Sequence, residues 1–181
     1  MRRAIQRLVL VSVVILSGHL AITFAHEAVA GDHLWKSYTN ERFQYAICYP
    51  DDLLVPQGES PNSDGQKFLA KDGAQLIVFG QYNALNQPLS AVSANTAARL
   101  AGPSGKVTYK VLKQNWFVVS GTNAQTIFYA KTLYGGDQFK SFELTYSHST
   151  AAVYEPLGVY GGMNENFVLV AGWSRWQADG V

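Results

Sequence analysis

The chain has 181 residues, a length typical of one domain. Hydrophobic residues make up 48% of it and charged residues only 15%, a composition that excludes an intrinsically disordered chain. Its formal net charge of +1 excludes the strong basic field that attracts nucleic acid or an anionic membrane surface, so neither is expected as a partner.

The first 30 residues have the pattern of a secretory signal peptide. Three arginines precede the apolar stretch 8–16, and small residues follow it. The small residues Ala28 and Ala30 predict cleavage after Ala30, with cleavage after Ala25 as the alternative. Residues 31–181 would then form a single globular domain, located in the periplasm or outside the cell.

An uncleaved anchor helix is the other interpretation of the N-terminal segment. A membrane-spanning helix needs about 20 apolar residues, whereas Ser17, Gly18 and His19 interrupt this stretch. We therefore expect no stable membrane insertion once the signal peptide is cleaved.

The first half of the mature chain predicts strands and one helix. Large apolar residues alternate with smaller ones over 43–49, which places its large side chains on one face of a strand. The runs 66–70 and 75–82 flank an Asp-Gly pair that is typical of a hairpin turn. Apolar residues then recur at helical spacing until Gly102-Pro103, so a helix is predicted over 88–101.

The second half predicts a meander of four strands, because short turns rich in Asn and Gly separate four strand-like runs. The runs are 106–112, 116–121, 125–134 and 138–147. Each should have one apolar face, which the predicted helix can cover. In the first and last runs the residues on that face would be Val107, Tyr109, Val111, Phe142, Leu144 and Tyr146.

The C-terminal segment predicts a short helix that glycines interrupt. Residues 151–154 favour a helix, but Gly158, Gly161 and Gly162 follow before one apolar face is complete. We therefore expect an irregular tail from about residue 158. The predicted fold class is α+β, an antiparallel β-sheet meander covered by helices.

The N-terminal part of the mature chain adds a pattern of aromatic residues to this order of elements. Tyr38 and Asn40 precede the aromatic strand, which Tyr49-Pro50 closes, and the polar segment 62–65 follows. From Trp35 to about Tyr154 the chain resembles the PsbP-like α/β/α sandwich, a fold found in small exported bacterial proteins of unknown function. The resemblance implies a binding or assembly module rather than an enzyme. It also implies a regular closing helix after residue 157, from which the glycines of this chain depart.

Catalytic signatures are few in this sequence. A hydrolase would have Cys48 or Ser147 as its nucleophile and His148 as its base. Cys48 lies within a predicted strand without a cationic neighbour, which is typical of a buried thiol. As the one cysteine of the chain, it excludes an intramolecular disulfide, so stability must come from the apolar core. We favour a noncatalytic protein.

Metal and cofactor sites are not expected. The segment Asn62-Ser63-Asp64-Gly65 is similar to part of a calcium loop, but it lacks the downstream glutamate and also suits a simple turn. Cysteine and histidine spacing forms no zinc site, and no glycine-rich phosphate loop or nucleophile elbow is present in the sequence.

Binding residues are expected on the loops at one end of the sheet. Aromatic residues make up 13% of the chain, and those outside the alternating strand positions are candidates for exposed recognition groups: Trp35, Tyr82, Trp116, Trp173 and Trp176. The predicted binding residues are Asn62, Asp64, Asn115, Trp116, Trp173 and Trp176. Local packing is the alternative role for the tryptophans.

Three functional hypotheses follow from these features. The first is an exported, soluble, noncatalytic binding or assembly module whose partner is a protein of the cell envelope. The second is a periplasmic inhibitor or immunity protein that blocks a toxin or a hydrolase. The third is the Cys or Ser hydrolase described above.

Overall fold

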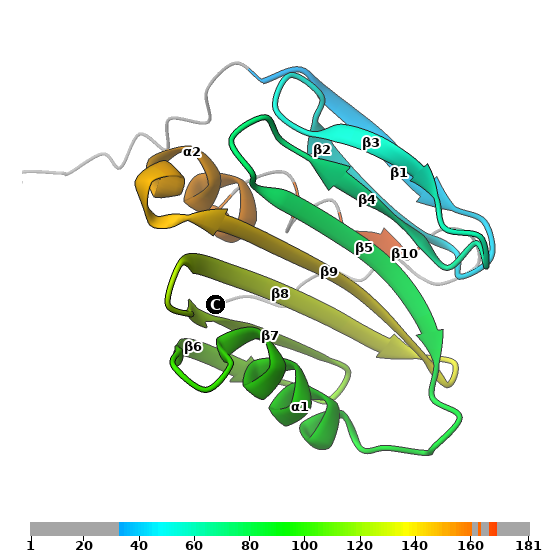
Figure 1. The fold of residues 1–181 in the computed structure, drawn as a ribbon. Helices are drawn as coiled ribbons and strands as arrows, with labels where there is room; N and C mark the ends of the chain where they lie inside the picture. The colour runs from blue at the N-terminus through cyan, green and yellow to red at the C-terminus, as the bar shows by residue number, and fades with distance from the viewer. Residues whose placement is uncertain (1–32, 161–162, 164–166, 170–181) are drawn as a thin grey trace, which may run out of the picture.

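The computed structural model describes residues 33–160, 163 and 167–169 (Figure 1). The predicted signal peptide and the predicted binding residues Trp173 and Trp176 lie outside the described residues. The elements, in chain order, are β1 (Trp35–Asn40), β2 (Tyr45–Pro50), β3 (Val55–Glu59), β4 (Gly65–Leu69), β5 (Gln75–Tyr82), α1 (Leu89–Ala101), β6 (Lys106–Leu112), β7 (Trp116–Thr122), β8 (Thr126–Gly135), β9 (Gln138–Ser147), the 3-10 turn η1 (His148–Thr150), α2 (Ala151–Glu155), the π-helical turn η2 (Pro156–Tyr160) and β10 (Val168–Leu169).

The strands form two antiparallel sheets. The seven-stranded sheet has the order β3-β4-β5-β9-β8-β7-β6, and the three-stranded sheet has the order β1-β2-β10. The predicted meander is confirmed as β6 to β9, and the predicted hairpin as β4 and β5. The pairing of β5 with β9 joins the two units, with Gln75 opposite Thr145 and Tyr82 opposite Gln138.

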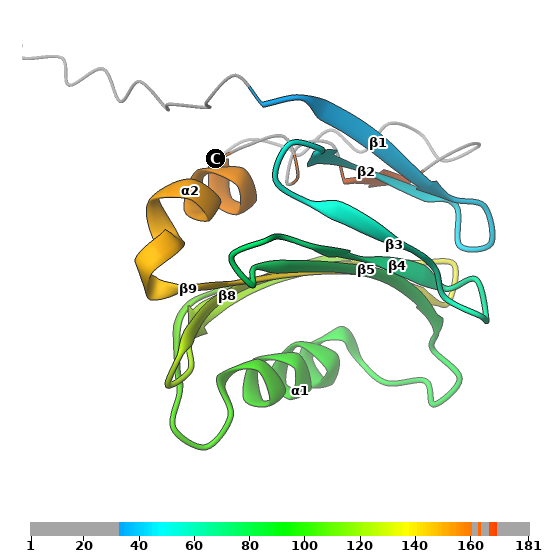
Figure 2. The ribbon, with the colours of Figure 1, turned by 45° about the horizontal axis from the view of Figure 1, so that its top comes forward.

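The domain has three layers with the seven-stranded sheet in the middle (Figure 2). Helix α1 covers one face of this sheet, and the three-stranded sheet lies with α2 against the other face (Figure 2). Because both of its faces are covered, β9 is buried along most of its length, including the polar side chains of Ser141 and Glu143. The predicted α+β class is confirmed, but the second cover is largely a sheet rather than a helix.

The larger core fills the space between the two sheets and α2. The alternation over 43–49 is confirmed, because Tyr45 and Ile47 are fully buried. Phe167 joins the layers, since its ring packs 5.9 Å from that of Tyr45 and 5.2 Å from that of Phe142. Burial of each such side chain contributes about 1.5–3 kcal/mol, and this core holds the two sheets together.

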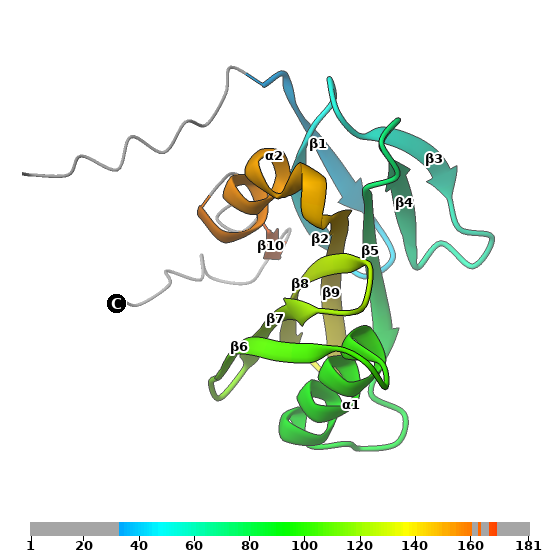
Figure 3. The ribbon, with the colours of Figure 1, turned by 60° about the vertical axis from the view of Figure 1, so that its left-hand side comes forward.

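A second, smaller core lies beneath α1. The helix begins after Pro88 and ends at Gly102, whose φ of 63° suits a glycine, so the predicted bounds are confirmed. Leu89, Val92 and Ala97 of α1 pack with apolar residues of β7 and β8. The helix therefore covers the β6 to β8 side of the sheet, and Figure 3 shows it lying beside β6 and β7.

The prediction that Val107, Tyr109 and Val111 share one apolar face of β6 was wrong. The register of β6 against β7 shifts between Val107 and Tyr109, so Val107 lies opposite Gly121 while Val111 lies opposite Val118. Gly121 and Val118 point to opposite faces because side chains alternate along a strand, and the bulge therefore splits Val107 from Val111. Tyr109 is 55% exposed.

Two further segments form elements that were not predicted from the sequence. Residues 55–59, which contain Pro56 and Gly58, form the edge strand β3 with an irregular register against β4, as edge positions allow. The tail is not irregular throughout, because η2 continues the helix to Tyr160 and β10 pairs with β2. Leu157 of η2 is buried in the larger core.

No helix within the described part of the chain is long and apolar enough to cross a membrane.

Candidate functional site

The predicted binding residues Asn62 and Asp64 lie in the turn between β3 and β4. The Asn62 side-chain amide donates to a carboxylate oxygen of Asp64 at 2.8 Å, and Ser60 Oγ donates to the other at 2.5 Å. The main-chain N–H of Gly80 donates to the Asp64 carbonyl at 2.7 Å, which ties this turn to β5. The side chains of the segment thus stabilise a turn, as its composition predicted.

The predicted binding residues Asn115 and Trp116 lie where β7 begins. The half-buried Trp116 ring packs against the larger core, and Lys131 Nζ lies 5.9 Å from the ring centroid. Burial lowers the pKa of Lys131. The Asn115 carbonyl accepts a hydrogen bond from the Tyr134 N–H at 2.8 Å. Trp116 therefore has the local packing that was its alternative role, and its binding role stays a prediction.

These two turns lie at the same end of the seven-stranded sheet but not side by side. Tyr82 pairs with Gln138 and Leu133 pairs with Trp116, so both turns share the end at which β8 turns into β9. However, β5, β9 and β8 separate β4 from β7. At about 4.8 Å per strand, the turns are about 20 Å apart, and they do not form one site.

An arginine and two aromatic rings lie beside the β3–β4 turn. The Arg42 guanidinium carbon lies 5.1 Å from the Phe43 ring centroid and 6.0 Å from that of Tyr82, within the range of cation–π attraction. The Arg42 guanidinium also donates to the Asn62 carbonyl. Tyr82 is 56% exposed, which confirms its expected exposure. This stack presents a positive group and an aromatic ring to solvent.

The loop from β5 to α1 follows directly after Tyr82 and presents a leucine to solvent. The Asn83 side chain is buried and makes two hydrogen bonds to the main chain of Gln87, at 2.8 and 3.0 Å. The Asn83 N–H donates to the Asp137 carbonyl at 2.8 Å. Leu85 is 78% exposed within this internally bonded loop. We call the Arg42–Tyr82 stack, together with Leu85 of the loop that follows Tyr82, the loop-end surface.

Tyr82 was predicted to be exposed from the sequence, whereas Arg42 and Leu85 were not among the predicted binding residues. A single leucine in the polar run 83–87 was the available signal for Leu85. The proximity of Arg42 to Tyr82 had no such signal, because it depends on the position of the β1–β2 turn beside β5.

The proposed hydrolase residues are distributed over two sheets. Cys48 lies on β2 opposite Ser37, whereas Ser147 ends β9 in the other sheet. The Ser147 hydroxyl shares hydrogen bonds with those of Ser149 and Thr150, at 2.8 and 3.1 Å. Among the residues that the structure describes, no hydrogen bond joins His148 to either nucleophile, and no cluster of His, Cys, Asp or Glu could hold a metal ion.

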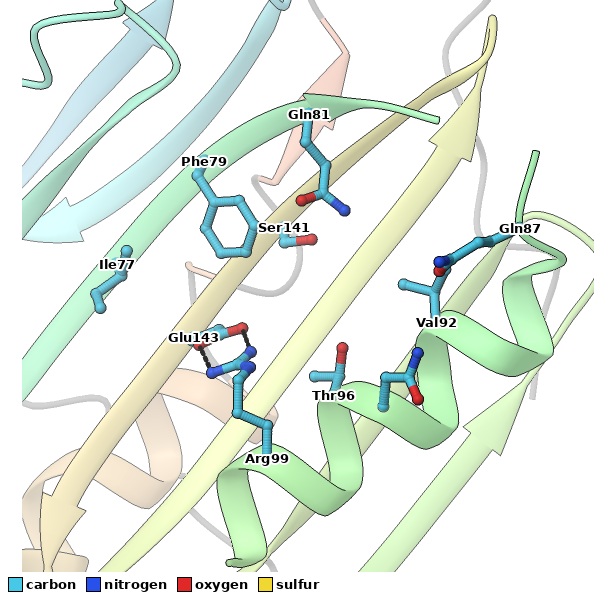
Figure 4. Close-up of a pocket in the computed structure, with 10 residues that line it drawn as sticks. Ile77, Phe79, Gln81, Gln87, Val92, Thr96, Arg99, Ser141 and Glu143 are labelled. Carbon is cyan, nitrogen blue, oxygen red and sulfur yellow. Dashed lines mark hydrogen bonds and ion pairs between the residues drawn. The ribbon is translucent and has the colours of Figure 1, made fainter. Parts of the chain in front are cut away.

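A cleft of about 520 Å³ opens beside α1, where the helix stops short of β5 (Figure 4). Its floor consists of residues of β5 and β9, and one wall is the side of α1 that faces them. The floor residues are Ile77, Phe79, Gln81, Ser141 and Glu143. The wall residues are Val92, Asn95, Thr96 and Arg99 of α1, together with Gln87 of the loop before the helix. The volume lies within the usual range of small-molecule sites.

An ion pair crosses this cleft from α1 to the central strand β9. Both terminal nitrogens of Arg99 donate to the carboxylate of Glu143, one of them at 3.1 Å (Figure 4). The Glu143 side chain is only 8% exposed, whereas that of Arg99 is 56% exposed. The pair therefore neutralises a buried carboxylate and leaves the outer edge of the guanidinium accessible from the cleft.

Comparisons with known proteins identify the fold of this chain. No model of a protein family matches the sequence, and no curated protein matches it significantly. Among solved structures, the solution structure of cyanobacterial PsbP (CyanoP) from Synechocystis sp. PCC 6803 is similar, with a TM-score of 0.54 and 12% sequence identity. The match covers 77% of this chain and 95% of that one. The protein thus has a PsbP-like α+β fold, as the resemblance in the sequence implied.

Proposed function

We propose that this protein is an exported, noncatalytic binding module that holds a protein partner of the cell envelope at its loop-end surface. The observation that carries the proposal is Leu85, which is 78% exposed on a loop that Asn83 holds in place. The export part rests on the signal-peptide pattern of residues 1–30. The PsbP-like fold supports a binding or assembly role in general terms.

The loop-end surface has the properties of an interface centre. Tyr and Arg are enriched among the residues that dominate binding energy. Burial of an exposed leucine against a partner lowers the free energy of the complex. Because the hydrogen bonds of Asn83 already fix the loop, a partner need not order it, which lowers the entropic cost of association. Arg42 would add attraction for an acidic group of the partner.

Affinity capture with matched variants tests the binding site. The tagged mature protein is recovered from the envelope of its own host, and the co-purifying protein is identified by mass spectrometry and then purified. We expect Leu85→Ala and Tyr82→Ala each to weaken its affinity about tenfold. Leu34→Ala is the control, because Leu34 is also strongly exposed, at 69%, but lies before β1 at the opposite end of the domain.

Equal affinity of the wild type and both loop-end variants would overturn the proposed site. A partner that is a toxin or a hydrolase inhibited on binding would identify the inhibitor function instead of an assembly function. Export is tested separately by N-terminal sequencing, for which we expect a mature start at Gly31 in the soluble envelope fraction. Recovery of Met1 in the membrane fraction contradicts it.

A further inference from the structure

The cleft beside α1 contains polar side chains that the fold does not use. Within the described part of the chain, the side-chain amides of Gln81, Gln87 and Asn95 make no hydrogen bond to protein. Each amide can both donate and accept. Gln81 and Asn95 are exposed and Gln87 is half-buried, so a ligand in the cleft can take the place of the water that these amides bind.

The floor of the cleft adds an apolar surface to these amides. The half-buried ring of Phe79 lies on the floor between β5 and α1, next to Ile77 (Figure 4). An aromatic ring of this kind packs against the apolar face of a ligand. The ligand should therefore combine an apolar face with several groups that both donate and accept hydrogen bonds.

The charges of the cleft favour a neutral ligand. Among the described residues, Arg99 and Glu143 are the charged ones that line the cleft, and they neutralise each other as an ion pair. Because the pair has no net charge, it offers little net attraction to an anion or to a cation, and a cation would in addition meet the exposed guanidinium of Arg99. A neutral ligand instead can accept hydrogen bonds from the outer N–H groups of Arg99.

An extended peptide fits this floor less well than a ligand bound through side chains. Peptide segments commonly bind by adding a strand to an exposed sheet edge. Here the main-chain groups of β5 and β9 already pair with each other from Gln75 to Tyr82, and those of α1 are used within the helix. The cleft therefore offers side chains and no unpaired strand.

We propose that the cleft binds a short neutral saccharide. The C–H face of one sugar ring lies on Phe79, and its hydroxyl groups exchange hydrogen bonds with Gln81, Asn95 and the outer edge of Arg99. A sugar hydroxyl donates and accepts as the side-chain amides do, so each can make a complementary pair. This inference is independent of the loop-end surface, which lies outside the cleft.

The test is an NMR titration of the ¹⁵N-labelled mature protein with three neutral probes: maltotriose, cellotriose and N-acetylchitotriose. We expect at least one of them to shift the amide signals of Phe79 and Asn95 in a saturable manner below about 10 mM. Phe79→Ala should weaken this binding about tenfold and Asn95→Ala about fivefold. Ser90→Ala is the control, because Ser90 is exposed on α1 but does not line the cleft.

Several outcomes would overturn the saccharide assignment. They are no saturable shift with any of the three probes, binding that both cleft variants leave unchanged, and tighter binding of a neutral tripeptide or of a charged trisaccharide. Asn95 is exposed on the helix surface, so Asn95→Ala should fold normally even if Phe79→Ala does not. Failure of this proposal would not affect the proposed binding role of the loop-end surface, because the two experiments use different variants and different ligands.

Discussion

The Tyr154 hydroxyl donates to the carboxylate of Asp72, 82 residues earlier in the chain, at 3.1 and 3.0 Å from its two oxygens. Tyr154 lies on α2, and Asp72 lies in the turn between β4 and β5. The Tyr154 ring also stacks on the Tyr146 ring, with the two ring centroids 5.6 Å apart. Burial, and then the hydrogen bond to Asp72, raises the pKa of Tyr154. This contact fixes α2 over one end of the larger core.

Removal of the Tyr154 hydroxyl tests this contact. We expect Tyr154→Phe to lower the free energy of unfolding by about 1–2 kcal/mol, because the ring stays packed while a hydrogen bond to a carboxylate is lost. Urea denaturation measures the change. Tyr109→Phe is the control and should change stability by less than about 0.5 kcal/mol, since Tyr109 is 55% exposed. An equal effect of both substitutions would contradict the assigned role.

The raised pKa of Tyr38 predicts how the stability of the domain changes at alkaline pH. Burial and its hydrogen bond to Glu59, at 2.7 Å, raise the pKa of Tyr38 from 10.0 to about 12. Below pH 10 the hydroxyl is protonated in both states, and the wild type should be more stable than Tyr38→Phe. Between pH 10 and 12 the unfolded state loses the proton first, so this advantage should shrink as the pH rises.

The measurement for Tyr38 is the difference in free energy of unfolding between the wild type and Tyr38→Phe across pH 8 to 12. The subtraction removes the contributions of other titrating groups that the substitution does not affect. A difference that stays constant or grows above pH 10 contradicts the prediction.

The close approach of Gly80 and Phe43 predicts that substitutions at these two positions have coupled effects on stability. A methyl group at Gly80 would overlap the Phe43 side chain, which packs over β5. Gly80→Ala should therefore destabilise the domain by about 1–3 kcal/mol. In a Phe43→Gly background the overlapping side-chain atoms, Cβ included, are removed, so the same substitution should cost at least about 1 kcal/mol less. Additive effects in the double variant would show that Gly80 is needed for another reason.

The ion pair of Arg99 and Glu143 predicts an asymmetric response to substitution. Arg99→Met leaves the Glu143 carboxylate, 8% exposed, without its partner and should cost about 1–3 kcal/mol. Arg99→Met combined with Glu143→Gln should recover part of this loss, because the neutral amide is cheaper to bury than the carboxylate. Thermal unfolding at pH 7 provides the comparison. A double variant that is less stable than Arg99→Met would be inconsistent with the argument.

Trp116 predicts a loss of stability as well as of binding. Its ring packs against the larger core, so Trp116→Ala should lower the free energy of unfolding by about 1–3 kcal/mol. If Trp116 also contacts a partner, affinity should fall about tenfold while the domain remains folded. Denaturation and a binding titration of the same variant separate the two effects, and full affinity in a folded variant removes Trp116 from the binding site.

The hydrophobic period of the sequence was sufficient for most elements. The helix over 88–101 and the four meander strands were predictable because each repeats its apolar residues at the spacing of its own secondary structure. The Asn62–Gly65 turn was predictable from residues that hydrogen-bond within their own segment. Local patterns of this kind need no information from distant parts of the chain.

The prediction failed where a position depends on a distant segment. The bulge in β6 moves Val111 away from the face of Val107, and no local pattern distinguishes this register from a regular one. The short strand β10 forms because β2 offers an unpaired edge to residues 168–169. In both cases the partner strand decides the structure, through main-chain hydrogen bonds that the residue types do not specify.

The sequence by itself determined most of the elements, the apolar face of most of these and the signal-peptide pattern, because periodicity and composition are local properties. Only the tertiary structure decided the candidate sites. Arg42 meets Tyr82 because the β1–β2 turn lies beside β5, and the cleft exists because β5 pairs with β9 beyond the reach of α1. Such sites arise from contacts between residues far apart in the chain, and a single sequence carries no record of which distant residues come into contact.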